Sequence, residues 1–207
     1  MSDLQDRIRR GEGLQLDFKF RIDDQKKIAR TLVAFANAQG GSLLIGVKDS
    51  GKVTGVNPEE EYYMVEGAAD LHTKPRVSFE TKVWQEKHHL VLEVVVEKAK
   101  VKHQAIDEEG KWKSFVRVDD HTLVGNKILE KVWHFETHGV NRPEKFDDTT
   151  LDFIRLIKIE QPVTISGLYR KSNLAMKKVD SLVSVLVFWR VIEMKMTELA
   201  TAYCLSE

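Results

Sequence analysis

The stretch that decides the fold of this 207-residue chain is residues 34–46, which read AFANAQGGSLLIG. Just before and within it, Ile28, Leu32 and Phe35 recur at positions i, i+4 and i+7. That spacing places apolar side chains on one face of a helix. We therefore expect a helix with one buried stripe, capped by an aspartate at position 23 or 24.

Two glycines end this helix. Gly40 and Gly41 permit a positive φ and a close approach of backbone segments, and Asn37 can satisfy backbone groups at the helix end. A glycine turn can also hold phosphate, but this one follows a helix instead of opening one, so its amide-rich end points elsewhere. We interpret these residues, together with Phe35 and Gly46, as structural, and we expect a strand after them.

Acidic side chains stand on both sides of this stretch. Residues 11–19 read GEGLQLDFK, with the alternation of a half-buried strand. Glu12 and Asp17 are five residues apart and would face opposite sides of a regular strand, so they can share a site only if the flanking glycines bend the chain. Asp49 lies in an Asp-Ser-Gly turn, which we expect to close a hairpin over residues 42–56.

The rest of the first two thirds of the chain mixes hairpins with helices. Asn57 and Pro58 read as the cap and first-turn proline of a helix. Further strands and a helix are expected at residues 76–83, 89–96, on both sides of the turn at 107–110, and at 126–137. This order predicts an α+β fold with a mixed sheet, hairpins and packed helices, and not a repeated βαβ series.

These motifs resemble the core of the Schlafen/AlbA-like domain, a family described as DNA-binding, and we interpret the chain as a bacterial member. The resemblance covers the first two thirds of the chain and is densest over residues 12–56. It implies that Glu12, Asp17 and Asp49 match the carboxylates that cut RNA in the Schlafen nucleases, where Mg²⁺ or Mn²⁺ would offset their mutual repulsion. The residues also permit a structural alternative, with Asp49 serving its turn and Asp17 paired with Lys19.

Two departures from the family favour binding over catalysis. The loop over residues 117–122 places Asp119 and Asp120 where the family has small residues, which brings negative charge toward any phosphate. This weakens the case for nucleotide binding, and no Walker-type run is present to restore it. The histidines lack zinc spacing and Cys204 has no partner, so no zinc site is visible. His121 beside the aspartates leaves a metal ligand open as an alternative to a solvated loop. We expect Lys19 and Arg117 to contact nucleic acid.

A second domain is expected after a linker. We place the first domain at residues 1–138, the linker at 139–147 and the second domain at 148–207. The second contains amphipathic helices at 151–160, 165–171 and 176–190, then strands at 191–196 and 200–205. Three helices followed by a β-hairpin are the outline of a winged helix-turn-helix.

Basic residues gather where the turn of that motif would lie. The cluster comprises Arg170, Lys171, Lys177 and Lys178 around Asn173. In a helix-turn-helix, lysines and arginines at this place bind phosphates, and Asn173 or Lys177 can reach base edges in the major groove. A solvated charged face is the alternative.

The last helix carries more apolar side chains than a small core can bury. From Leu182 to Trp189 they cover most of its circumference, which predicts packing on the first domain or on a second copy of the chain. We therefore expect a homodimer.

Composition limits the remaining possibilities. Lysine plus arginine and aspartate plus glutamate both number 32, so any nucleic-acid surface must be local. A single cysteine fits a reducing compartment, and no apolar run approaches membrane-spanning length, so we expect a cytoplasmic protein. The function that we expect is nucleic-acid binding, with DNA favoured over RNA, in a transcriptional regulator. The alternatives are a metal-dependent endoribonuclease and a protein-interaction adaptor.

Overall fold

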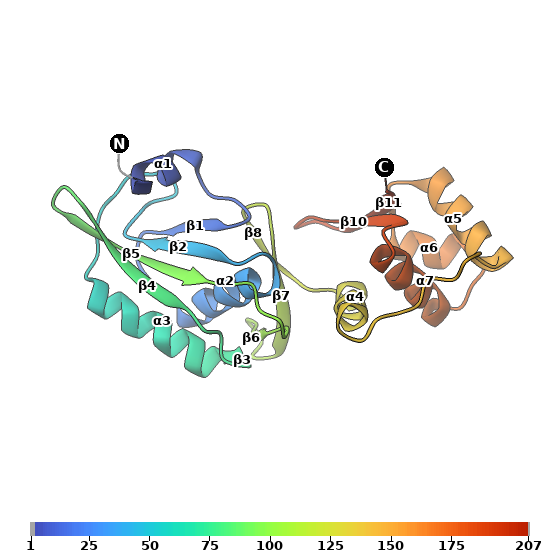
Figure 1. The fold of residues 1–207 in the computed structure, drawn as a ribbon, viewed down its shortest axis with the longest axis horizontal. Helices are drawn as coiled ribbons and strands as arrows, with labels where there is room; N and C mark the ends of the chain where they lie inside the picture. The colour runs from blue at the N-terminus through green and yellow to red at the C-terminus, as the bar shows by residue number, and fades with distance from the viewer. Residues whose placement is uncertain (1–2, 207) are drawn as a thin grey trace. The chain divides into compact units, whose positions relative to one another are not determined.

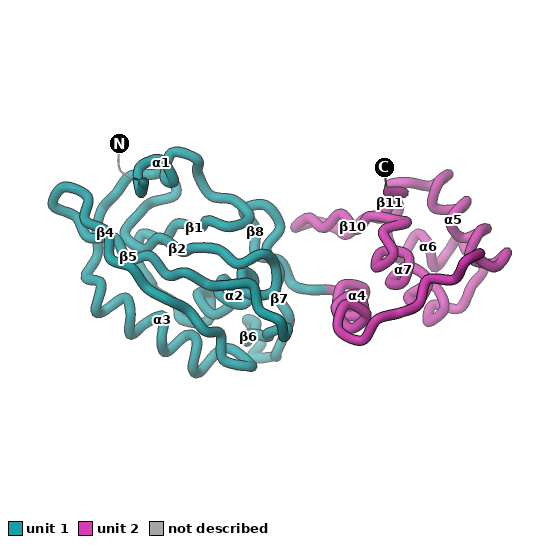
Figure 2. Tube along the Cα trace, in the orientation of Figure 1, with its two compact units in different colours: residues 1–125 teal, residues 126–207 magenta. Residues whose placement is uncertain are grey.

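The protein, in a computed structural model that describes residues 3–206, consists of two compact units that divide between Gly125 and Asn126 (Figure 2). The expected boundary at residues 138–148 differs from this division by one helix. That helix, α4 (Lys127–His138), packs on the last helix of the second unit.

A four-stranded mixed sheet forms the centre of the first unit (Figure 1). β1 runs parallel to β2, with α2 (Gln25–Asn37) connecting them, and every other neighbouring pair is antiparallel. The strands in spatial order are β1 (Leu16–Lys19), β2 (Gly41–Ile45), β5 (His89–Val96) and β4 (Glu80–Glu86). The predicted mixed α+β architecture is confirmed here.

The two faces of the sheet are covered by different helices. On β2, Leu43 and Ile45 belong to the core beneath α2, whereas Leu44 belongs to a separate cluster with Leu4 of α1 (Asp3–Arg10). This division follows from the alternation of side chains along a strand. β2 is consequently buried on both faces, which explains its unbroken apolar run.

α2 is buried around nearly its whole circumference, not along one stripe as expected. Besides the mixed sheet it packs on α3 (Pro58–His72) and on β6 and β7 of a second sheet. That sheet contains, in order, β3 (Thr73–Lys74), β6 (Gln104–Ile106), β7 (Trp112–Val118) and β8 (His121–Val124). A helix that is apolar all round is typical of an element enclosed between two layers.

The hairpin expected over residues 42–56 forms only in part, beyond the end of β2. There the Lys48 N–H donates to the Lys52 carbonyl over 3.0 Å, the Thr54 N–H donates to the Gly46 carbonyl over 2.8 Å, and Val47 bridges antiparallel to Val53. β2 itself pairs with β1 and β5. A turn tripeptide reports local geometry alone, and here both edges of β2 are occupied by strands from elsewhere in the sequence.

The second unit is a helical module with a small antiparallel sheet. Its core contains Phe153, Leu168, Val183 and Tyr203. In chain order α4 is followed by α5 (Asp148–Glu160), β9 (Val163–Thr164), α6 (Ile165–Lys171), α7 (Met176–Phe188), β10 (Ile192–Met196) and β11 (Thr201–Leu205), with the sheet order β10-β11-β9. The predicted helices and the final hairpin are present, and β9 is an addition.

The apolar surplus of α7 is covered in part within its own unit. Phe135 of α4 meets Phe188 edge-on at 5.8 Å, and Phe146 stacks on Trp189 at 5.9 Å between ring centroids. The Trp189 indole N–H also donates to the Val140 carbonyl over 3.3 Å. The surface from which we expected a homodimer therefore has an internal partner, supplied by α4 and by the segment expected to be a linker.

The longest helix is α3, with 15 residues. No helix within residues 3–206 is both long enough and apolar enough to cross a bilayer.

Candidate functional site

The loop before β1 bends as the sequence requires. Gly11 has φ +81°, and the Gly13 N–H donates to the Leu16 carbonyl over 2.8 Å. The bend carries Glu12 back along the strand, where its Oε1 accepts the Phe18 N–H at 2.8 Å. Glycine at position 11 is needed for the left-handed backbone conformation.

Glu12 and Asp17 consequently meet. The pKa of Glu12 is raised above 4.5, mainly by burial. The hydrogen bond from the Phe18 N–H lowers this pKa, whereas the hydrogen bond with Asp17 and the negative charge of Asp17 raise it further. Two carboxyl groups in contact favour a shared proton because both cannot easily be ionised. The pair could accept a cation, or it could be neutralised by the protein itself.

Neutralisation comes from two basic side chains. Arg117 Nη2 lies 3.0 Å from Asp17 Oδ1, and Lys19 Nζ lies 2.7 Å from Asp17 Oδ2. Arg117 also donates to the Gly13 carbonyl at 3.1 Å and to Thr122 Oγ1 at 3.3 Å. Its side chain is only 3% exposed, so our expectation that Arg117 contacts nucleic acid is corrected: the guanidinium is enclosed. The pairing of Lys19 with Asp17 is the structural alternative that the sequence offered.

Asp49 does not join the pair. It is exposed, in a turn where the Gly51 N–H donates to the Lys48 carbonyl over 2.7 Å. Within residues 3–206, no three histidine, cysteine, aspartate or glutamate side chains gather closely enough to hold a metal ion. The described geometry thus brings together two of the three predicted carboxylates.

The helix-ending motif is structural, and Asn37 acts differently from our expectation. Its side-chain amide donates to the carbonyls of His103 and Phe115 at 2.9 and 2.8 Å and accepts the His103 N–H at 2.8 Å. It therefore joins α2 to the second sheet instead of satisfying its own helix end. These backbone groups are buried and cannot bind water, so each bond from Asn37 gives one of them the hydrogen-bond partner that it needs.

The glycines of the motif are required by close contacts. A Cβ on Gly40, where φ is +74°, would lie 2.8 Å from the Val96 carbonyl oxygen, and one on Gly41 would lie 2.5 Å from the Phe35 ring. Gly46 has φ +102° and packs on Gly55. No larger residue fits these positions without displacement.

In the loop that departs from the family, residues 119–121 are exposed. His121 Nδ1 lies 2.6 Å from Asp120 Oδ1, and a backbone hydrogen bond followed by this contact lowers the pKa of Asp120. Asp119 adopts φ +52°. His121 thus pairs with its neighbour, and it belongs to no three-residue metal group among the described residues.

The basic cluster of the second unit lies on its surface, at the turn between α6 and α7. All five expected residues, Arg170, Lys171, Asn173, Lys177 and Lys178, are exposed. Asn173 has φ +51°, which turns the chain after α6. Lys171 forms an ion pair with Glu160, so the cations of the first turn of α7 are the principal candidates for phosphate contacts.

Two networks built on buried carboxylates were not predicted from the sequence. In the first unit, Glu93 accepts from Arg7 and from the Trp84 indole, both at 2.7 Å. In the second unit, Asp180 accepts from Tyr169 and lies 2.9 Å from Lys127 Nζ. The available signal was a lone acid inside an apolar strand or helix, which must find a partner if it is buried.

A family model described as "Schlafen, AlbA_2" matches residues 12–124. The chain has no match among curated proteins. Among solved structures, the DIP2311 protein from Corynebacterium diphtheriae is 15% identical with a TM-score of 0.44, and the match covers 80% of this chain and 31% of that one. The N-terminal domain of an ATP-dependent DNA helicase RecG-related protein from Nitrosomonas europaea is 20% identical with a TM-score of 0.40, over 70% of this chain and 96% of that domain.

Proposed function

The chain belongs to the Schlafen AlbA_2 family, and from that premise we propose that it is a nucleic-acid-binding protein that contacts duplex DNA through its second unit. The resemblance to a family described as DNA-binding supports this proposal. The contact surface has to be local because the chain carries equal numbers of acidic and basic residues.

We assign the second unit to the winged-helix class. Its order α5, β9, α6, α7, β10, β11 provides three helices, a short strand between the first two, and a final hairpin that would be the wing. α6 and α7 would be the helix-turn-helix, with α7 as the recognition helix that enters the major groove.

The observation that carries this proposal is the orientation of α7. Lys177 and Lys178 are exposed in its first turn, whereas Val179, Leu182 and Val183 are buried. The helix is therefore fixed by its apolar face, and its basic start faces outward. Lysines there would bind phosphates, and Asn173 beside them could reach a base edge.

The test is the salt dependence of binding to duplex DNA. The double variant Lys177→Ala/Lys178→Ala should bind more weakly, and the slope of log K against log salt should become shallower by about 1.8, since each lost duplex contact removes about 0.9. Lys145→Ala/Lys158→Ala removes the same charge from exposed positions elsewhere in this unit and is the control. Equal slopes for the two double variants would contradict the assignment. A role as a transcriptional regulator further requires preference for one duplex sequence over another.

The endoribonuclease remains the second candidate because Glu12 and Asp17 are in contact. Against it, Arg117 and Lys19 already neutralise Asp17. Cleavage of structured RNA that requires Mg²⁺ or Mn²⁺, stops with EDTA and disappears in Glu12→Gln would establish it. The adaptor hypothesis drew on the balanced charge of the chain and on the apolar face of α7, and α4 covers part of that face.

A further inference from the structure

Two histidines lie one turn apart on α4, in the second unit. His134 and His138 are exposed, whereas Val132 and Trp133 beside them are buried. Residues four apart on a helix share one face, and here the two imidazole rings stack, with their centroids 4.0 Å apart and their planes inclined by 28°. The pair lies outside residues 12–124, which the family model matches.

One of the two rings is already held in a tautomer that can bind a metal. His138 Nδ1 lies 2.9 Å from the His134 carbonyl oxygen. A carbonyl oxygen only accepts hydrogen bonds, so Nδ1 carries the proton, and in the neutral ring the lone pair is on Nε2. Metal-binding histidines in proteins are commonly fixed in this way, by donating the other ring N–H to a backbone carbonyl. His138 therefore has Nε2 available to a metal ion.

The separation of the two rings suits a single ion. With Zn–N bonds of about 2.0–2.1 Å in tetrahedral geometry, two nitrogens on one zinc ion lie about 3.3 Å apart. Rings with centroids 4.0 Å apart need only small rotations of their side chains to reach that distance. The ion would lie beside the last turn of α4, where the helix dipole places partial negative charge and so favours a cation.

The ligand atoms indicate which metals fit. Imidazole nitrogen suits Zn²⁺, Cu²⁺ and Ni²⁺, whereas Mg²⁺ and Ca²⁺ prefer oxygen. The same spacing of two histidines occurs in the H-E-x-x-H helix of zinc proteases, although here the glutamate is at position 136 and not 135. No third histidine, cysteine, aspartate or glutamate joins the pair among residues 3–206. Water would complete the coordination, so the ion would be exchangeable, unlike one in a four-ligand structural zinc site.

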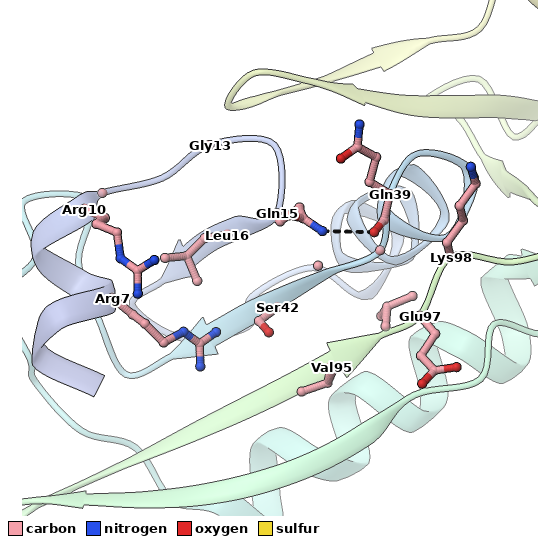
Figure 3. A pocket seen from close by; sticks show the side chains of 14 residues that line it. Arg7, Arg10, Gly13, Gln15, Leu16, Gln39, Ser42, Val95, Glu97 and Lys98 are labelled. Carbon is pink, nitrogen blue, oxygen red and sulfur yellow. Dashed lines mark hydrogen bonds between the residues drawn. The ribbon is translucent and has the colours of Figure 1, made fainter. Parts of the chain in front are cut away.

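Other places in the described part of the chain are less suited to a metal cation. The open groove beside α1 in the first unit, about 730 Å³ in volume, is lined by Arg7, Arg10 and Lys98 against a single carboxylate (Figure 3). These positive charges repel a cation. In the same unit, Lys19 and Arg117 already neutralise Asp17. We therefore expect one bound transition-metal ion per chain.

We propose that His134 and His138 form a binding site for one divalent transition-metal ion, Cu²⁺, Ni²⁺ or Zn²⁺, on α4. The ion joins side chains across the last turn of the helix, and it binds the folded protein more tightly than the unfolded chain, in which the two rings are not held together. Phe135 in this turn packs on Phe188 of α7, so the metal stabilises the second unit. The site is independent of the proposed function.

The first test is calorimetric titration of the full chain with Zn²⁺ in a buffer that does not chelate metals. One ion should bind per chain, and His134→Ala and His138→Ala should each weaken binding at least tenfold. Both positions are exposed, so these variants should fold as the parent does. Cu²⁺ should bind more tightly than Zn²⁺, and Mg²⁺ should give no binding at the same concentration.

The matched control is His88→Ala/His89→Ala, which removes two exposed histidines that are adjacent in sequence and do not share a helix face. Its affinity for Zn²⁺ should equal that of the parent. Equal weakening in the control and in the two single variants, or full affinity in both single variants, would overturn the proposal.

The second test measures the coupling of the metal to the fold. Zn²⁺ at 100 times its Kd should raise the Tm of the second unit by at least about 5 °C. EDTA should reverse the shift, and His134→Ala should abolish it. A Tm that does not change in the parent, or that rises equally in His134→Ala, would contradict a site that depends on the folded helix.

Discussion

Arg117 and Asp17, 100 residues apart in the chain, form an ion pair inside the first unit, with Nη2 and Oδ1 separated by 3.0 Å and side chains only 3% and 5% exposed. The pair joins β7 to β1, and the same guanidinium holds the loop that positions Glu12. Arg117 could have bound phosphate at the surface, but it instead neutralises a buried carboxylate inside the first unit.

The first prediction concerns the stability of this pair. Arg117→Met should lower the free energy of unfolding by up to about 3–5 kcal/mol, because Asp17 would remain buried with Lys19 alone to offset its charge. The control is Arg155→Met, whose pair with Asp152 is exposed on both sides and should contribute at most about 1 kcal/mol. Urea denaturation of both variants measures the difference. Similar losses for the two would show that the buried pair has no special role.

The second prediction concerns pH. Burial, reinforced by Asp17, raises the pKa of Glu12 above 4.5 in the folded protein, so the fold favours the protonated carboxyl. Its stabilising contribution is therefore complete below pH 4.5 and is lost as the pH rises through the folded pKa. Glu12→Gln cannot lose a proton, so the stability of the variant relative to the parent should increase between pH 4.5 and 7. A difference that stays constant in denaturation curves across this range would contradict the pKa direction.

Features encoded by neighbouring residues were predictable. The start of α3 follows from Asn57, whose Oδ1 accepts the Glu59 N–H at 3.2 Å, and from the proline after it. The contact between Glu12 and Asp17 follows from the glycines that bend their loop. In each case the deciding interaction lies within a few residues, where turn and cap chemistry is specific.

The unpredicted features depend on partners far away in the chain. Nothing near Asn37 indicates that its amide binds backbone groups 66 and 78 residues away. The burial of Arg117 depends on which strands flank β7, which a family loop pattern does not report. The apolar excess of α7 was recognised correctly, but its partner could not be derived from periodicity, since an apolar face fits any complementary surface.

The third prediction isolates Asn37. Asn37→Ala should cost about 2–5 kcal/mol, because it leaves the His103 N–H and two carbonyls without partners in a buried place, each at a cost of about 1–3 kcal/mol, partly relieved by relaxation. Asn141→Ala, at an exposed position, is the control and should change stability by less than about 0.5 kcal/mol. Thermal unfolding followed by circular dichroism measures both. Nucleic-acid binding of folded Asn37→Ala should be unchanged; a specific loss of binding would point to a direct role instead.

The last prediction concerns the attachment of α4 to the second unit. Asp180, nearly buried on α7, accepts from Tyr169 of α6 and pairs with Lys127 at the start of α4 over 2.9 Å. Burial alone would raise the pKa of Asp180, but the bonds from Tyr169 and Lys127 outweigh it and the pKa is lowered. The contribution of this carboxylate is therefore complete above pH 3.8 and is lost as the pH falls through the folded pKa.

Asp180→Ala should cost about 2–3 kcal/mol at pH 7, mainly through the charged hydrogen bond, and the loss should shrink in acid. Lys127→Ala should cost at most about 1 kcal/mol, since this lysine is 56% exposed and its pair is screened by water. If urea denaturation at pH 7 and pH 3 gives the same loss for Asp180→Ala, the ionised carboxylate is not what holds α4, α6 and α7 together.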